Sequence, residues 1–174
     1  MKYLVKIFVI IIFLFCNNLS YAENLIVYID MEKILNESKP GMSINKQLEK
    51  IHKMNIKEFK KIEDELKKKE ESIIAQKNIL SKEDYSKKIK ILREKTNNYR
   101  KSRQEKINLL TKKRMESSSK LLSIINPILS DYSKENDISI ILQKKNVVLA
   151  KTDLNITNKI IDILNSKIES INLN

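Results

Sequence analysis

The sequence predicts an α+β fold in which a small β hub, completed by oligomerisation, carries a long protruding α-helical hairpin. The 84 residues from Ser43 to Asn126 contain neither Gly nor Pro, a span far longer than an ordinary globular helix. Short β-branched runs lie on both sides of this segment. The whole chain has only one Gly and two Pro, which argues against an all-β fold because such folds use these residues in their turns.

The N-terminal residues 1–22 have the pattern of an export signal. Lys2 and Lys6 provide positive charge, Ile7 to Cys16 are all apolar, and Ser20-Tyr21-Ala22 offers small residues at the −3 and −1 positions of a cleavage site. As a helix, the apolar run would span roughly 15 Å, about half of a bilayer core. We therefore expect cleavage after Ala22, with an uncleaved signal anchor as the alternative. Cleavage would also remove Cys16, the only thiol in the chain.

The body of the protein is expected to begin with a strand and a short helix. Residues 25–29, Leu-Ile-Val-Tyr-Ile, are a β-branched and aromatic run typical of a buried strand. Asp30 can cap a brief helical turn that continues through Leu35. Pro40-Gly41 is expected to end this part before the long helical segment begins.

The long segment is predicted to fold back on itself as a hairpin of two helices. Its apolar residues recur three and four positions apart on both sides of residues 78–84, with polar residues diluting the stripe. Ser81 is a good N-cap and Asp84 can complete a capping-box-like pair, so we place the tip there. Each arm would be roughly 50–65 Å long. The predicted seam positions are Ile44, Leu48, Ile51, Phe59, Ile62, Leu66, Ile89, Leu92, Tyr99 and Leu110.

The remaining residues are predicted to return to the body. Pro127 should kink the second helix or begin a new turn, because it lacks an amide donor. Residues 138–142 and 147–150 read as two strands of a hairpin around residues 143–146. An amphipathic helix capped by Asn155 or Thr157 follows. One subunit would then have three short strands with unpaired edges and a small core, so we expect an obligate homo-oligomer.

Positive charge is concentrated on the predicted arms. Residues 42–120 carry 24 Lys and Arg against 12 Asp and Glu, a net charge of +12, whereas residues 23–41 and 121–174 carry 8 against 10, a net charge of −2. Such a field indicates either a solvated surface or attraction to an anionic partner. Nucleic acid is not expected, because the chain is exported and its arms offer few aromatic rings for base stacking. The densest basic clusters are Lys67-Lys68-Lys69, Lys87-Lys88 and Lys112-Lys113-Arg114.

No residues stand out as catalytic or metal-binding. A single Gly cannot supply a phosphate-binding loop, and one His with one Cys cannot supply the common metal sites or His-based triads. We therefore expect a protein that works by binding, without a cofactor and without enzymatic activity.

The order of these predicted elements resembles the Skp (OmpH-like) family of periplasmic chaperones across residues 23–174. The sharpest part of the resemblance is Val147-Val148-Leu149-Ala150 followed by Asn155-Ile156-Thr157. Leu149 stands where the family usually has Tyr, which could alter packing at the hub. Asn155 stands where it usually has Asp, and Asn caps a helix about as well.

This resemblance implies a periplasmic homotrimer whose three arms surround a cavity and hold unfolded outer-membrane proteins without ATP. Composition and charge along the chain divide it into a signal peptide (1–22), a body (23–41 and 121–174) and an arm (42–120). The seam residues and basic clusters named above become candidate client-binding positions. Packing inside the hairpin is the alternative for the seam, and a solvated face is the alternative for the clusters. Two alternatives remain: an envelope tether that binds one folded partner, and a protein that binds anionic lipid or lipopolysaccharide.

Overall fold

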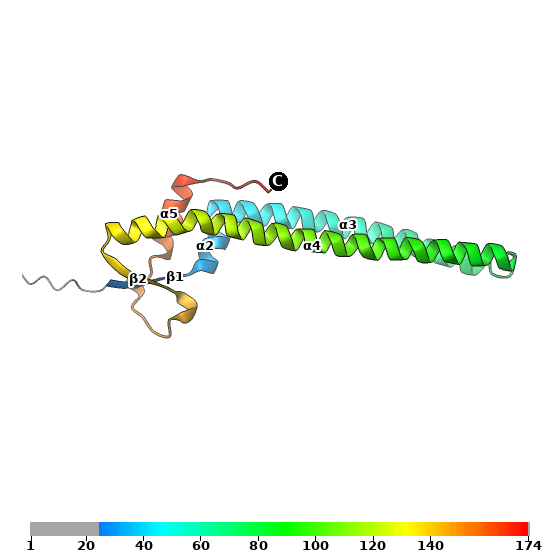
Figure 1. Cartoon of the computed structure of the whole chain (residues 1–174), viewed down its shortest axis with the longest axis horizontal. Helices are drawn as coiled ribbons and strands as arrows, with labels where there is room; N and C mark the ends of the chain where they lie inside the picture. The colour runs from blue at the N-terminus through cyan, green and yellow to red at the C-terminus, as the bar shows by residue number, and fades with distance from the viewer. Residues whose placement is uncertain (1–24, 174) are drawn as a thin grey trace, which may run out of the picture.

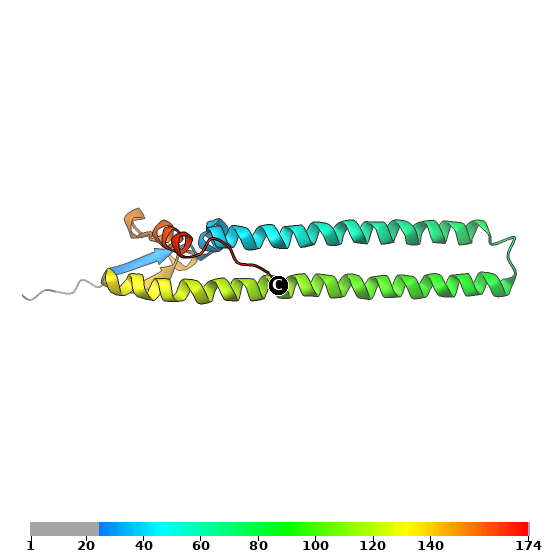
Figure 2. The same ribbon diagram turned by 90° about the horizontal axis from the view of Figure 1, so that it is seen from above.

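A computed structural model describes residues 25–173, and it shows a long helical hairpin projecting from a small body (Figures 1 and 2). The predicted α+β class is therefore confirmed. The predicted export signal lies outside the described residues. In chain order the elements are β1 (Leu25–Ile29), α2 (Met31–Glu37), α3 (Lys39–Ala75), α4 (Lys82–Glu135), β2 (Ile138–Gln143), the 3-10 turns η1 (Lys144–Asn146) and η2 (Thr152–Leu154), and α5 (Thr157–Lys167).

A sharp corner joins the short helix α2 to the first arm helix α3. The predicted Asp30 cap is present, since the Lys33 N–H donates to Asp30 Oδ1 at 3.0 Å. Ser38 caps α3 and accepts a hydrogen bond from the Gly41 N–H at 3.2 Å. Pro40-Gly41 therefore does not lie before the arm, as predicted, but inside the first turn of α3. Proline is tolerated there because the first amides of a helix have no intrahelical partner.

The hairpin tip lies where the sequence predicts it. Helix α3 ends at Ala75 and α4 begins after Ser81. Ser81 Oγ accepts from the Asp84 N–H at 3.1 Å and donates to Asp84 Oδ2 at 2.8 Å. Helix α4 then continues through Pro127 to Glu135, so Pro127 does not begin a new helix.

The sheet differs from the prediction. Strands β1 and β2 pair in parallel, with Ile26 opposite Ile140 and Tyr28 opposite Leu142, and the whole arm forms the connection between them. The predicted strand at residues 147–150 is wrong, and the described residues contain two strands rather than three. The 3-10 turn η1 directs the chain away from β2, and Lys144 Nζ contacts Asp30 Oδ2 at 3.0 Å.

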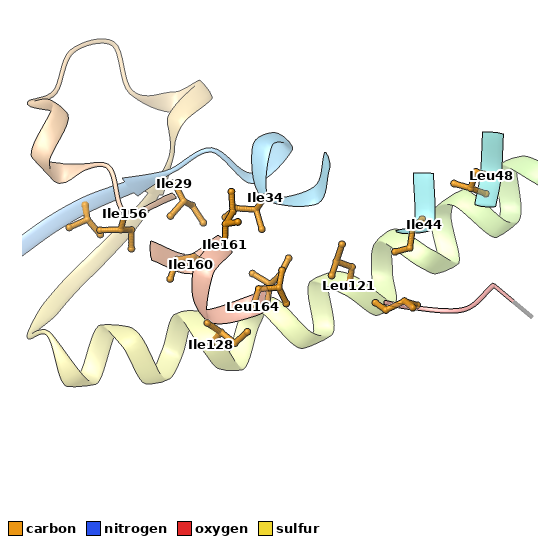
Figure 3. Packing of buried hydrophobic residues seen from close by; sticks show 13 residues of the cluster. Ile29, Ile34, Ile44, Leu48, Leu121, Ile128, Ile156, Ile160, Ile161 and Leu164 are labelled. Carbon is orange, nitrogen blue, oxygen red and sulfur yellow. The ribbon is translucent and has the colours of Figure 1, made fainter. Parts of the chain in front are cut away.

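The core lies where α5 packs against α2, α4 and β1 (Figure 3). The predicted apolar face of α5 is confirmed, since Ile160, Ile161 and Leu164 are all buried. The helix begins at Thr157 and its N-cap is Ile156, which makes no side-chain cap hydrogen bond, so the predicted cap at Asn155 or Thr157 is wrong. Asn155 Oδ1 instead accepts from the Thr157 N–H at 3.0 Å. Ile125 of α4 is also fully buried, and it is not among the predicted seam positions.

Candidate binding surface

The predicted seam residues lie between the two arm helices. Ile44 and Leu48 are buried where the arm joins the body. The others are half-buried: Ile51, Phe59, Ile62, Leu66, Ile89, Leu92, Tyr99 and Leu110. Much of their apolar surface therefore serves hairpin packing, and only the remainder faces solvent.

An aromatic and charged cluster connects the helices midway along the arm. The rings of Phe59 and Tyr99 meet edge to face, with centroids 6.2 Å apart. The Arg103 guanidinium carbon lies 5.6 Å from the Phe59 ring centroid, and Arg103 pairs with Glu63 at 3.4 Å. The Tyr99 hydroxyl donates to Glu63, and burial together with this carboxylate raises the pKa of Tyr99. These directional contacts fix the register of α3 against α4 in a region where the apolar seam is thin.

A groove of about 1280 Å³ lies at the base of the arm, between both arm helices, α2 and η1. This basal groove has an apolar floor that includes Leu48, Phe59 and Leu110, and charged residues of both signs surround it. Ile56 and Ile107 line it and remain 51% and 44% exposed. The groove can therefore accept the apolar side chains of a bound polypeptide, while the surrounding charged residues contact its polar backbone.

Exposed apolar residues along the arm are the feature that the sequence analysis missed. They lie off the seam, so a search for residues three and four positions apart did not select them. A search for isolated apolar residues on the charged faces could have found them. They are Met42, Met54, Ile56, Ile74, Ile79, Ile91, Ile107, Leu109 and Met115.

The structure brings two of the three predicted basic clusters together. Lys68 and Lys69 of α3 line a hollow of about 540 Å³ near the tip, opposite Lys88 and Lys95 of α4. Contact with Lys69 lowers the pKa of the Lys95 ammonium group. Lys67 and Lys87 are exposed and lie outside the lining of this hollow.

The third basic cluster lies toward the base of the arm. Lys112 pairs with Glu116 at 3.8 Å, Arg114 lines the basal groove, and Lys113 is half-buried. The three residues therefore do not share one site.

Residues 25–173 contain no group of three or more His, Cys, Asp or Glu side chains that could hold a metal ion. None of the helices in this part of the chain is both long enough and apolar enough to cross a membrane.

These features define a class of protein in which a coiled-coil hairpin projects from a small α+β body. The chain belongs to the OmpH-like family, since residues 25–164 match the family described as outer membrane protein (OmpH-like). Its fold is similar to the crystal structure of an OmpH-like protein from Caulobacter crescentus CB15, described as a candidate outer membrane chaperone. The match has a TM-score of 0.78 and 16% identity, and covers 85% of this chain and 88% of that chain. None of the curated proteins matches the sequence.

Proposed function

We propose that this protein is an ATP-independent periplasmic holdase that binds unfolded outer-membrane proteins between its arms and prevents their aggregation. The observation that carries the proposal is the arm surface, where dispersed exposed apolar residues accompany a net positive charge and meet a mixed apolar and charged groove. Family membership supports it, as does the description of the similar Caulobacter protein.

This surface suits an unfolded client for physical reasons. Unfolded barrel strands alternate apolar and polar side chains, so they need many weak apolar contacts with polar neighbours rather than one deep pocket. Flexible Lys side chains on the arm can cover apolar client segments with their methylene stems while their ammonium groups stay in water. In this proposal the client contacts the exposed parts of the seam, the off-seam apolar residues and the basic clusters.

The proposed active form is a homotrimer with a shared hub. The sheet has only two strands in the described chain, and Ile26, Ile140 and Leu142 are at least 40% exposed on it. Val148 and Leu149 are more exposed still, at 103% and 92%. Such apolar surface on a body with few strands is expected to be covered by other subunits. Sedimentation equilibrium of residues 23–174 tests this. A monomeric protein would have no cavity between arms, so that result would contradict the proposed trimer.

The proposal also assigns a function to each segment of the chain, beginning with export. Residues 1–22 would direct the protein to the periplasm and be cleaved after Ala22. Residues 23–41 and 121–174 would form the oligomerisation body, and residues 42–120 would form the client-binding arm. Mass spectrometry of the protein purified from the cell envelope would locate the first residue of the mature chain.

Client binding can be measured by Trp fluorescence of the client without a Trp signal from the chaperone, because the chain contains no Trp. An unfolded outer-membrane barrel protein that contains Trp, diluted from urea into increasing amounts of the chaperone, should show saturable changes in Trp emission. Folded barrel protein in detergent is the control and should show no change. If the emission of the unfolded client does not respond, or if only one client sequence responds, the holdase proposal is wrong and a tether with one partner is favoured.

The basic hollow near the arm tip supports a second candidate function, the binding of an anionic amphiphile. Lys68, Lys69, Lys88 and Lys95 surround it, and Ile91 and Leu92 lie within its lining. Binding to anionic lipid vesicles or lipopolysaccharide should then weaken steeply with salt, because the contacts are exposed charges. Lys88→Gln combined with Lys95→Gln should strongly reduce vesicle binding, whereas unfolded-client binding should fall only slightly, because it is spread over many contacts along the arm.

A further inference from the structure

The last described segment crosses the base of the arm as a strap. Residues 168–173 leave α5 without helical structure and run beside the hairpin (Figure 2). Ile171 is buried, with 5% of its surface exposed, and Leu173 packs against the hydrophobic core. Asn172 between them is exposed. The strap therefore presents alternate side chains inward and outward, as a β-strand does.

A single glutamine side chain holds the backbone of this strap. Gln47 Nε2 donates to the carbonyl oxygen of Ile171 at 2.7 Å, and Gln47 Oε1 accepts from the Leu173 N–H at 3.0 Å. These two backbone groups flank Asn172, and in an extended chain they face the same edge. The Gln47 amide therefore binds the strap as a neighbouring strand would, through groups that every residue except proline possesses.

Both arm helices contribute to the surface that the strap covers. We call this surface, which includes Ser43, Gln47 and Ser117, the seat. The Gln47 amide nitrogen also lies 3.1 Å from the Ser43 carbonyl oxygen and 3.2 Å from Ser43 Oγ, which orient the side chain. On α4 the strap passes beside Ser117, a small residue that is itself buried. At the start of the strap, Lys39 Nζ contacts Glu169 Oε1 at 3.5 Å. Both helices thus contribute to a seat for an extended segment with apolar residues at alternate positions.

We propose that this seat is a binding site for extended polypeptide, that the strap occupies it in the absence of client, and that unfolded barrel strands displace the strap. The inference rests on the proposed holdase function and identifies one site within it. Gln47 recognises only backbone, so the seat would accept many sequences. The selectivity would come from apolar residues two positions apart, as at Ile171 and Leu173, and membrane β-strands have this pattern.

Displacement would exchange like contacts for like, because a client segment with the same alternation can replace both the buried apolar side chains and the backbone hydrogen bonds of the strap. The hydrogen bonds to the backbone of residues 171–173 come from Gln47, and a client segment can replace them one for one. The strap competes as a tethered ligand, whose effective concentration is in the millimolar range for a short linker. Isolated short segments should therefore bind weakly to the intact protein, whereas a long client with many such segments should compete better.

A labelled peptide tests the seat directly. The probe is a fluorescein-labelled peptide with the sequence of residues 167–174, and its binding is measured by fluorescence anisotropy. The double variant Ile171→Ser/Leu173→Ser of the full exported chain should release the strap and bind the peptide about 10- to 100-fold more tightly than the unaltered protein. The same peptide with Ser at both apolar positions should not bind.

Gln47→Ala in the strap-released variant should weaken peptide binding by about 10-fold or more, because two hydrogen bonds are lost together. Gln104→Ala is the matched control, since Gln104 is an exposed arm residue bonded to neighbouring Asn108. Equal affinity in the strap-released and unaltered proteins, or equal effects of Gln47→Ala and Gln104→Ala, would overturn the inference.

A second measurement needs no substitution and therefore no assumption about variant folding. Hydrogen exchange at the Leu173 amide of the unaltered protein should accelerate when saturating unfolded barrel protein is added. The client backbone would then occupy Gln47 Oε1, which accepts the Leu173 hydrogen bond in the absence of client. If the client binds but the Leu173 amide stays as protected from exchange as before, the proposed displacement of the strap is wrong, while the holdase function stands. Absence of client binding in the Trp titration refutes the proposed function itself, so the two failures can be told apart.

Discussion

Gly41 is the only glycine in the chain, and it lies where α2 turns into α3. A Cβ atom at this position would be 2.0 Å from the Leu35 carbonyl oxygen and 2.9 Å from Ser38 Oγ. The first neighbour is backbone, which cannot move without distorting α2. Gly41 is therefore required because α2 and α3 approach each other too closely here for a side chain.

Gly41→Ala should lower the free energy of unfolding by at least ~2 kcal/mol, because the corner must shift to admit the methyl group. Urea unfolding followed by circular dichroism measures the change. Met42→Ala is the control, because Met42 is 51% exposed and its truncation should have little effect. Similar stability for the two variants would contradict the steric role of Gly41.

Asp30 connects three parts of the body. Its carboxylate accepts from the Lys33 N–H and from Lys144 Nζ, each at 3.0 Å, and its own N–H donates to Thr157 Oγ1 at 2.8 Å. The Lys33 N–H, followed by Lys144, lowers the pKa of Asp30. The ionised form is therefore favoured by folding, and its stabilisation exists above the ordinary aspartate pKa and is lost as pH falls through the lowered value.

Asp30→Ala should cost about 1 kcal/mol of stability at pH 7. The difference from the unaltered protein should shrink as pH falls below about 4, because protonation removes the same interactions. Urea unfolding at pH 7 and pH 3 measures both quantities. Asp30→Asn keeps the cap, so it should lose less at pH 7. An Asp30→Ala deficit that does not change with pH would contradict the carboxylate's role.

Residue-scale prediction from the sequence succeeds where the interaction is local. The caps at Asp30 and Ser81 were predictable because each bonds three residues along the chain. The Gly41 corner was not, because the obstructing carbonyl belongs to the preceding helix. Gln47 gave no signal in the sequence either, since its partners at residues 171–173 lie more than 120 residues away.

Among the elements, the arm was the most predictable and the sheet the least. A three-and-four periodicity sustained without Gly or Pro favours only a long helix, and the cap at Ser81 located the turn. The run Val147-Val148-Leu149-Ala150 has the composition of a strand, but η1 directs it away from β2. Strand pairing depends on which distant segment supplies the partner, so composition alone could not decide it.

The off-seam apolar residues of the basal groove provide an element-scale prediction. Ile56→Ser combined with Ile107→Ser should weaken binding of unfolded barrel protein by about 5- to 10-fold, because apolar contact area is lost. Stability should change little, since both side chains are about half exposed. Trp emission titrations and urea unfolding measure the two effects. Gln104→Ser is the control, because Gln104 is an exposed arm residue outside the lining of the groove. Equal client affinity in the groove variant and the control would exclude the basal groove from binding.

At the scale of the whole molecule, charge and shape act together. The net charge of +12 on residues 42–120 lies on the projecting hairpin, away from a body that is slightly acidic. This separation could be predicted from the sequence by counting charged residues in each segment. The strap and the exposed sheet face could not be predicted, because they depend on how distant segments pack.

Salt should therefore slow the capture of acidic clients. Between about 50 mM and 500 mM NaCl, the association rate for an acidic unfolded barrel protein should fall by about 10-fold or more, because screening shortens the reach of the arm's field. Stopped-flow Trp emission measures this rate. A client with net positive charge should show no such decrease. The same salt dependence for both clients would contradict electrostatic attraction by the arms.

The central claim is that the arm surface keeps unfolded barrel proteins from aggregating without ATP. Light scattering after dilution of a urea-unfolded outer-membrane barrel protein into buffer, with and without residues 23–174, tests it most directly. One proposed trimer per client, without nucleotide, should suppress most of the scattering. Scattering that remains at the level of client alone, at this or higher ratios, would contradict the account.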